Sequence, residues 1–385
     1  MRDGLIEPDP AAGAANEATT GRVDVDFSLA IHNRTGKYFI GLDLIEMPDL
    51  PIGDVYYWLM AASAPPAGLK GKVIGRLQHL HIKARARGGL MRLLPRRRSA
   101  RPLLHLDPFT VPATMLGRSD AVLCHDLGPI THPQLFDPQI ATIYRAIYDE
   151  IAATGPHLIF VSKASQAQFA ALYPAATPAT NRVIYPAIRP GALRTLPRAV
   201  AGVSAPFLLT IGSIGHRKNQ LRCIQAFARS GLAAAGISYV IGGGPEPGFD
   251  EVCAVADATP GIVRLPYVDD AELSWLYRSA RGFVLVSQLE GFGMPVAEAI
   301  ARGLVPLVTR GSVLHEVAGD GALLADADDV DDIAAAMIAL AEMSDGNRAS
   351  RMRKLSRSIG RFDQDDIRAQ WRSAFGDILR TENPV

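Results

Sequence analysis

Cysteine is scarce in this 385-residue chain, which has three, at Cys124, Cys223 and Cys253. An odd number of scattered cysteines builds neither a disulfide framework nor the paired spacing of a zinc site. Long hydrophobic runs are also missing, because no stretch approaches the roughly 20 apolar residues that span a bilayer. The first ten residues lack the apolar core of a secretory signal. We therefore expect a cytoplasmic protein in a reducing compartment.

Acidic residues are absent from Val55 to Leu106, although the whole chain has 40 basic and 39 acidic residues. Within this span, the basic stretch (residues 70–101) mixes lysine and arginine with leucine, isoleucine and methionine. Such content favours an anionic membrane surface, where each cation contributes about 1 kcal/mol. A solvated basic loop and a polyanionic acceptor are the alternatives. Nucleic acid is disfavoured, because the stretch has no Phe, Tyr or Trp to stack on bases.

Apolar runs that alternate with helical patterns indicate an α/β protein with two doubly wound domains facing a cleft. The expected strands are 23–31, 121–124, 157–161, 183–185, 207–211, 239–241, 262–265, 283–286, 305–308 and 322–324. The expected domains are a disordered tail (1–21), an N-terminal domain (22–185), a proline-rich linker (186–205) and a C-terminal domain (206–363). A final amphipathic helix within 364–385 is expected to pack back on the N-terminal domain.

Residues 282–303 contain the motif around which we interpret the rest of the chain. A buried strand is followed by the glycine loop Glu290-Gly291-Phe292-Gly293 and by a helix that opens near Pro295 and ends at Gly303. Such a corner directs backbone N–H groups and the positive end of a helix at one point, which suits a phosphate or a sugar hydroxyl. Glu298, expected in the first helical turn, is placed to share a ligand with Glu290. Capping a turn and complementing the helix dipole are the structural alternatives for these two acids.

Two adjacent cations, Arg217 and Lys218, follow the strand 207–211 and precede a helix for which Asn219 is a good cap. They would repel each other and the helix dipole, and a bound anion would relieve both costs. Arginine can also hold phosphate oxygens through two donors. We interpret this pair as an anion site.

Polar residues also follow a strand in the N-terminal half, where His125 and Asp126 come after 121–124. Ligands of open α/β sheets bind at the carboxyl ends of strands, so both residues are placed to reach a cleft. A hydrogen-bonded structural histidine is the alternative. Gly36 lies in a turn before a helix, where it either turns the chain or lets a ligand approach.

In this order, these motifs resemble the family 4 retaining glycosyltransferases of GT-B fold, with two Rossmann-like domains. The resemblance covers nearly the whole chain from about residue 23. Glu290 to Glu298 fits the family's E-x7-E signature, Gly212 to Asn219 fits its glycine, arginine and lysine loop, and 267–277 fits the segment near the base. The chain is most similar to bacterial mannosyltransferase-like members that build surface polysaccharides.

The resemblance implies a role for each matched residue. Arg217 and Lys218 would bind the donor diphosphate and take part in catalysis with Glu290, which contacts the donor sugar, and with His125. Glu298 would hold the ribose, while His125 and Asp126 would lie beside the acceptor. The remaining donor-binding residues would be Gly36, Gly212, Tyr267, Val268, Gly291, Phe292, Gly293, Met294, Pro295 and Val296. The loop at Gly36 has one glycine fewer than usual in the family, and a Val-Ser precedes the central motif where Pro-Ser is frequent.

The activity implied is transfer of a hexose, with mannose favoured, from a GDP- or UDP-linked sugar to a glycan or lipid-linked acceptor. Transfer would retain the anomeric configuration and use neither cofactor nor metal. Asp24 and Asp26 lie inside the first expected strand, a poor place for an Asp-x-Asp metal pair. The setting would be bacterial surface polysaccharide synthesis, in the cytoplasm or at the inner face of the cell membrane, with no nucleic acid partner.

Three alternatives differ in class. A sugar-nucleotide epimerase or phosphorylase-like enzyme could use the same fold, but a basic and apolar surface has little use for a small soluble substrate. A non-catalytic sugar-nucleotide binding module would keep the cleft without turnover. A nicotinamide dehydrogenase would need a G-x-G-x-x-G turn, and Gly212 to Gly215 does not have that spacing.

Overall fold

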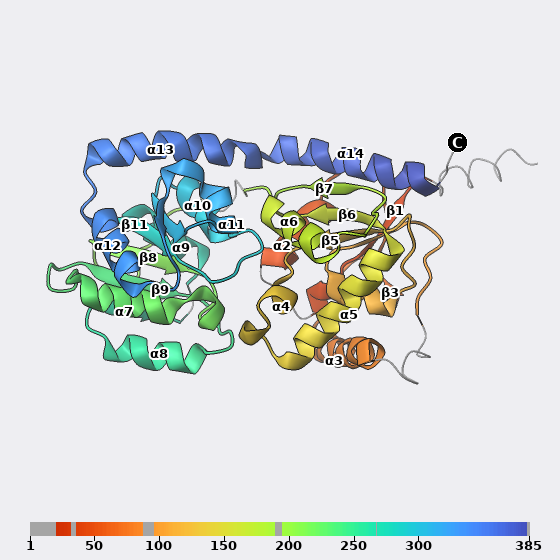
Figure 1. The fold of residues 1–385 in the computed structure, drawn as a ribbon, viewed down its shortest axis with the longest axis horizontal. Coiled ribbons are helices and arrows are strands. Elements are labelled where there is room, and N and C mark those ends of the chain that lie inside the picture. Colours follow the sequence, from red (N-terminus) through yellow and green to blue (C-terminus); the bar gives the residue numbers. More distant parts are fainter. Residues whose placement is uncertain (1–20, 32–35, 88–95, 189–194, 267, 383–385) are drawn as a thin grey trace, which may run out of the picture.

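The computed structural model describes residues 21–31, 36–87, 96–188, 195–266 and 268–382. These residues form two parallel sheets, each covered by helices on both faces and lying side by side (Figure 1). The α/β, doubly wound fold expected from the sequence is therefore confirmed. The N-terminal tail, the loop before Gly36 and Tyr267 lie outside the described residues.

The N-terminal sheet has the order β3-β2-β1-β4-β5-β6-β7 among the described residues, and it is parallel except for β3. Its strands are β1 (Val23–Asp26), β2 (Ile52–Tyr57), β3 (Met60–Ala61), β4 (Leu103–His105), β5 (Ala121–Cys124), β6 (His157–Phe160) and β7 (Asn181–Val183). Its helices are α2 (Gly36–Ile45), α3 (Gly68–Arg87), α4 (Gly128–Thr131), α5 (Pro138–Thr154) and α6 (Lys163–Leu172), with short 3-10 turns at 28–31, 108–113 and 133–135.

The C-terminal sheet has the order β10-β9-β8-β11-β12-β13 among the described residues, and all of its pairs are parallel. Its strands are β8 (Phe207–Ile211), β9 (Ser238–Gly242), β10 (Ile262–Leu265), β11 (Gly282–Leu285), β12 (Pro306–Thr309) and β13 (Leu323–Ala325). Its helices are α7 (Gln220–Ser230), α8 (Phe249–Ala258), α9 (Asp270–Ser279), α10 (Met294–Ala301), α11 (Val313–Ala318), α12 (Val330–Ala341) and α13 (Asp345–Ile359).

The expectations for the first strand and for 183–185 were partly wrong. The strand expected over 23–31 ends at Asp26, because the Asp26 carboxylate accepts a hydrogen bond from the Ser28 N–H at 3.0 Å and a 3-10 turn follows. The strand expected over 183–185 is β7, which ends at Val183. We did not anticipate β2, β4 or helix α3, because the basic stretch masked the usual apolar pattern of this part of the chain.

The two sheets are tied together by α11 and by the closing helices. The Glu316 carboxylate of α11 accepts hydrogen bonds from the N–H groups of Lys163 and Ala164, at 2.8 and 2.9 Å, and so caps α6 of the N-terminal sheet. Helix α14 (Gln364–Glu382) follows α13 and crosses back over the N-terminal sheet (Figure 1). There Trp371 and Phe375 are buried. None of the helices among the described residues is long and apolar enough to span a membrane.

Candidate functional site

The strand order places one site in the C-terminal sheet. From β8 the chain continues to β9 on one side, whereas β11 lies on the other side and leads to β12. In open α/β sheets, the crevice outside the carboxyl ends of two such strands is where ligands bind. The loop after β8 contains Arg217 and Lys218, and the loop after β11 contains Glu290.

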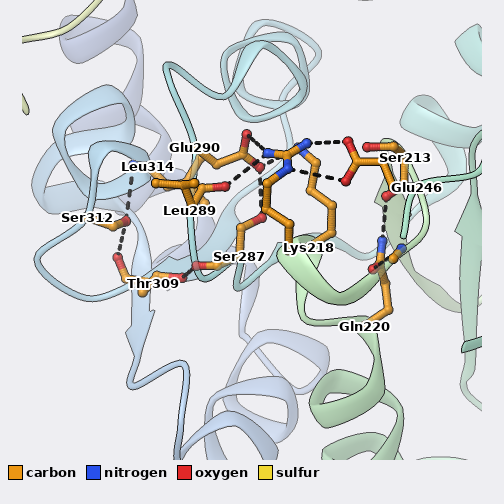
Figure 2. A network of polar contacts seen from close by, with 12 residues as sticks. Ser213, Lys218, Gln220, Glu246, Ser287, Leu289, Glu290, Thr309, Ser312 and Leu314 are labelled. Atoms are coloured by element: carbon orange, nitrogen blue, oxygen red, sulfur yellow. Dashed lines mark hydrogen bonds and ion pairs between the residues drawn. The ribbon is translucent and has the colours of Figure 1, made fainter. Parts of the chain in front are cut away.

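These three side chains form one ion-pair cluster. Figure 2 shows Lys218 and Glu290 within it. The buried Lys218 ammonium contacts the Glu290 carboxylate, which also accepts a hydrogen bond from the Ser287 hydroxyl at 2.8 Å. Arg217 lies 3.3 Å from the second oxygen of Glu290. Its guanidinium also donates two hydrogen bonds to Glu246, at 2.5 and 3.2 Å. The two cations predicted to need an anion are therefore neutralised by carboxylates of the protein itself.

Charge governs the protonation of this cluster. Burial raises the pKa of the Glu290 carboxyl, but the Lys218 and Arg217 charges and the hydrogen bonds more than offset it and leave the pKa below its usual value. Burial alone would lower the pKa of the Arg217 guanidinium. The Glu290 and Glu246 charges outweigh burial and raise this pKa above its usual value. Glu290 and Arg217 are therefore held in their charged forms. A diphosphate entering the cluster would compete with two carboxylates for the same donors.

Asn219 has a different role from the one we predicted. It precedes α7, as expected, but its side chain makes no cap, and its backbone is left-handed with φ of 60°. The Asn219 amide nitrogen instead donates to the carbonyls of Val286 and Ala327, at 3.0 and 2.8 Å. It thereby ties the loop after β8 to the strand β11 and to the segment after β13.

Glu298 lies one turn farther along its helix than we predicted. Helix α10 opens at Met294 after Gly293, whose φ is 98°, so Pro295 is its second residue and Glu298 its fifth rather than part of the first turn. The Glu298 carboxylate lies 3.4 Å from the Tyr277 hydroxyl and 4.0 Å from Arg302.

The rest of the predicted donor side surrounds these loops. Gly212 and Gly243 let the loops after β8 and β9 touch, since a Cβ on Gly243 would lie 1.7 Å from the Gly212 carbonyl oxygen. Val268 is half-buried and precedes the capping box that Asp269 and Glu272 form at the start of α9. The predicted loop and helix residues Gly291, Phe292, Met294 and Val296 lie between β11 and the body of α10.

His125 and Asp126 face this site from the N-terminal sheet. A Cβ on Gly291 would lie 2.6 Å from the His125 carbonyl oxygen, so the two loops are in contact. The His125 ring is 3% exposed, and its Nε2 donates to the Leu106 carbonyl at 2.8 Å. Burial lowers the pKa of His125 to about 4, helped by the nearby Lys37 charge, so the ring is neutral at pH 7. The Asp126 carboxylate accepts from the Gly128 N–H at 2.9 Å.

Gly36 is the exposed first residue of α2, and a Cβ there would have no atom within 4 Å. Sequence reasoning missed Glu246 and Ser287, which hold Arg217 and Glu290. Glu246 follows the glycine run after β9, next to β8, but its pairing with Arg217 gives no signal in the sequence. Among the described residues, no group of three or more His, Cys, Asp and Glu side chains is placed to hold a metal ion.

Residues 199–358 match the family described as glycosyl transferases group 1. The chain resembles GT-B glycosyltransferases. Structural similarity supports the same fold over more of the chain. A UDP-forming α,α-trehalose-phosphate synthase from Burkholderia xenovorans, in complex with glucose-6-phosphate, aligns with a TM-score of 0.55 and 12% identity over 80% of this chain and 79% of that chain.

Two relatives in Escherichia coli match shorter parts of this GT-B chain. The O-antigen chain mannosyltransferase B is 35% identical over 133 residues, which cover 34% of this chain and 35% of the relative. The serotype-specific mannosyltransferase WbdA is 26% identical over 141 residues, which cover 36% of this chain and 17% of the relative. These matches thus span about a third and a sixth of the relatives' own lengths.

Proposed function

We propose that the protein is a glycosyltransferase that moves a hexose from a nucleotide-diphosphate sugar to a sugar-containing acceptor. One observation carries the proposal. Arg217, Lys218 and Glu290 form a largely buried charged cluster at the carboxyl ends of β8 and β11, and the loop after β11 contacts His125 of the other sheet. The donor would bind at the cluster and the acceptor on the side of His125 and Asp126.

The cluster suits departure of a diphosphate. In transfer, the bond between the anomeric carbon and the diphosphate oxygen breaks, and a bond from that carbon to an acceptor oxygen forms. The acceptor hydroxyl proton leaves with the diphosphate. Arg217 and Lys218 would meet the growing negative charge, and a single preorganised donor of this kind contributes about 3–4 kcal/mol. Because two cations of the protein supply this charge, the proposal includes no metal and no cofactor.

The finer parts of the proposal follow the relatives. Similarity to mannosyltransferases favours mannose as the hexose. We propose in addition a GDP- or UDP-linked donor and retention of the anomeric configuration. The acceptor would be a glycan or a lipid-linked sugar in bacterial surface polysaccharide synthesis. An epimerase, a phosphorylase-like enzyme and a binding module on the same fold are distinguished from transfer by the products that form.

The basic stretch has two parts in the structure, and they bear differently on the proposed membrane contact. Three of its arginines are held inside the protein: Arg96 pairs with Glu150, Arg97 with Asp26, and Arg101 with Asp24 and Asp54. They are not available to lipid headgroups. Within the described residues, α3 instead presents the exposed apolar side chains Leu69, Val73, Leu77 and Leu80, with the exposed cations Lys70, Lys72 and Arg76 beside them. We therefore assign the proposed contact with an anionic membrane to α3.

The donor site is tested by calorimetry with GDP and UDP, without added metal, and by assay of sugar-nucleotide turnover. Arg217→Ala should weaken nucleoside-diphosphate binding at least tenfold, because a charge-assisted contact contributes about 1.5–3 kcal/mol. Glu246→Gln should strengthen it, because the carboxylate that competes for Arg217 is removed. Glu290→Gln should lower turnover more than it lowers donor affinity.

Arg229→Ala is the matched control, because Arg229 lies on α7 in an exposed ion pair with Asp331. Unchanged nucleoside-diphosphate affinity in Arg217→Ala and in a Lys218→Met/Glu290→Gln double variant would contradict the phosphate assignment. Tight nucleotide binding without transfer or hydrolysis of any sugar nucleotide would favour the binding module. Epimerised sugar nucleotide as product would favour the epimerase.

A further inference from the structure

The N-terminal sheet repeats the arrangement of the donor side. From β1 the chain goes to β2, whereas the neighbouring strand β4 leads to β5 on the opposite side. Lys37 lies in the first turn of the helix after β1, and Asp107 follows β4. Their side chains form an ion pair of 3.0 Å. It occupies the same position in its sheet as Lys218 and Glu290 do in the other, where open α/β sheets bind ligands.

A pocket of about 230 Å³ opens beside this pair, between α3, α5 and the 3-10 turn after Asp107. Its wall is aromatic: the rings of His79 and Phe109 lie 5.5 Å apart, and those of Phe109 and Tyr144 lie 6.0 Å apart and stacked. This volume is below the roughly 300–1,000 Å³ of sites for drug-sized ligands, so it has room for a small group such as one sugar ring.

Gln78 supplies an unmet hydrogen-bonding group in the same pocket. It lines the pocket and is 1% exposed, and its Oε1 has no hydrogen-bond partner among the residues that the structure describes. A buried carbonyl oxygen without a partner costs about 1–3 kcal/mol. A ligand hydroxyl that donates to this oxygen would recover that free energy.

We propose that this pocket binds a neutral sugar residue of the acceptor, and this inference rests on the proposed function. An aromatic face packs against the electropositive C–H edge of a sugar ring. The Lys37 ammonium can donate to one ring hydroxyl, while the Asp107 carboxylate and Gln78 Oε1 accept from others. Each of the three polar groups therefore has a partner on a polyhydroxyl ring.

Charge favours a neutral sugar over a sugar phosphate. Asp107 neutralises Lys37, and the Asp107 carboxyl is held ionised: burial raises its pKa, but Lys37 and the Phe109 N–H more than offset this and keep the pKa below its usual value. A phosphate would add about two negative charges beside this carboxylate and near Asp126. The pocket thus differs in its ligand from the glucose-6-phosphate held by the structural relative.

A short chain of protein contacts links the pocket to the donor loop. Asp107 follows Leu106, whose carbonyl holds the His125 ring, and the His125 carbonyl touches Gly291 of the donor loop. An acceptor sugar in the pocket would thus lie on the His125 side of the cleft, with its chain extending toward solvent.

The test uses saturation-transfer NMR on the full chain with GDP present, and methyl glycosides of mannose, glucose, galactose and N-acetylglucosamine as probes. At least one methyl glycoside should bind, more tightly than mannose 6-phosphate or glucose 6-phosphate. Gln78→Leu and Phe109→Ala should each weaken it at least fivefold and leave the GDP or UDP dissociation constant within twofold. Gln166→Leu is the matched control, because Gln166 is a half-buried residue of α6 that donates to Asn181 and does not line the pocket. Circular dichroism confirms folding of each variant.

Three results would overturn the inference: no methyl glycoside binds, a sugar phosphate binds more tightly, or both variants bind the glycoside as the wild type does. Gln78→Met, which keeps the side-chain length, provides a second variant if Gln78→Leu fails to fold. Failure of the proposed function has a separate signature, since nucleoside diphosphates would then not bind the wild type whatever the glycosides do.

Discussion

Lys37 and Asp107 form the ion pair whose pH dependence can be followed most directly. In the folded protein the pKa of the Asp107 carboxyl lies below its usual value despite burial, because of Lys37 and the Phe109 N–H. The pair therefore contributes stability above the unfolded pKa of about 4, and that contribution is lost as the pH falls. Without Lys37, the change of folding stability with pH would have the opposite sign.

Lys37→Met leaves Asp107 buried without its cation and with the Phe109 N–H as a remaining donor. We expect burial to outweigh this hydrogen bond and to raise the pKa of the carboxyl in the folded state. The variant should then lose stability as the pH rises above about 4, whereas the wild type should not. Removing one partner of a buried pair costs about 3–5 kcal/mol, and we expect about 3 kcal/mol at pH 8, because Lys37 is 27% exposed.

Urea unfolding at pH 4 and pH 8 measures this difference. Lys354→Met, on exposed α13, is the control and should cost the same small amount at both pH values. A Lys37→Met penalty that does not grow with pH would show that Asp107 is not held ionised by the lysine.

For single residues, the sequence predicted the positions of the charged side chains better than it predicted the residues with which they pair. Arg217, Lys218 and Glu290 could be placed because each directly follows an apolar strand, and parallel strands end at one edge of a sheet. Glu246 could not be ranked above other acids, because its pairing with Arg217 depends on how the loops after β8 and β9 fold against each other. Asn219 had the right position, but its left-handed backbone and its two carbonyl partners depend on distant loops.

Helix α3 is the element whose two faces differ most. Gln78 and Ile82 are buried on one face, while Leu69, Leu77 and Leu80 are 80%, 48% and 63% exposed. Exposed leucines repeated along one helix face, with lysine and arginine beside them, are typical of helices that lie in the headgroup region of a membrane. Helix α13 is also basic, but it lies on the opposite side of the molecule (Figure 1).

Neutralising Lys70, Lys72 and Arg76 to glutamine should weaken binding to vesicles that contain anionic lipid. Each cation near such a surface contributes about 1 kcal/mol, so the triple change should reduce binding by about 100-fold at low salt. Leu69→Ser with Leu80→Ser should weaken binding without changing its salt dependence. Vesicle flotation at two salt concentrations measures both effects.

The matched control neutralises Arg353, Lys354 and Arg357 on α13, which are exposed and equal in number. Vesicle binding that survives the α3 changes but not the α13 changes would move the membrane contact to the other side of the molecule. The sequence indicated that this region is basic, but not which of its cations are exposed and which pair inside the protein. The arginines at 96, 97 and 101 pair with acids of strands and helices far away in the sequence.

The two halves of the molecule meet at Gly291. A Cβ there would lie 2.6 Å from the His125 carbonyl oxygen, closer than real Cβ atoms come to other atoms. A larger residue would therefore hold the two sheets apart at the point where donor and acceptor loops touch. The sequence predicted two facing domains because its elements alternate, but it gave no sign of which residues form this contact.

Gly291→Ala should reduce turnover at least tenfold while nucleoside-diphosphate affinity falls much less, because Arg217 and Lys218 stay on the same sheet. Small-angle scattering should show a larger radius of gyration than in the wild type. Gly346→Ala is the control, because a Cβ on Gly346 meets no atom within 4 Å. Wild-type turnover in Gly291→Ala would show that the loop moves freely away from His125.

Helix α14 covers the N-terminal sheet, whose residues are synthesised long before those of the helix. Trp371, Phe375 and Ile378 are buried, and Arg182 of β7 pairs with Asp377 of the helix. Roughly 180 residues separate β7 from these side chains, which at about 5–20 residues per second is a delay on the order of 10–40 s during synthesis. Until α14 leaves the ribosome, the N-terminal sheet exposes the apolar surface that this helix covers. The half of the protein that is synthesised first is therefore the last to be finished, and it is the half that a chaperone would have to protect.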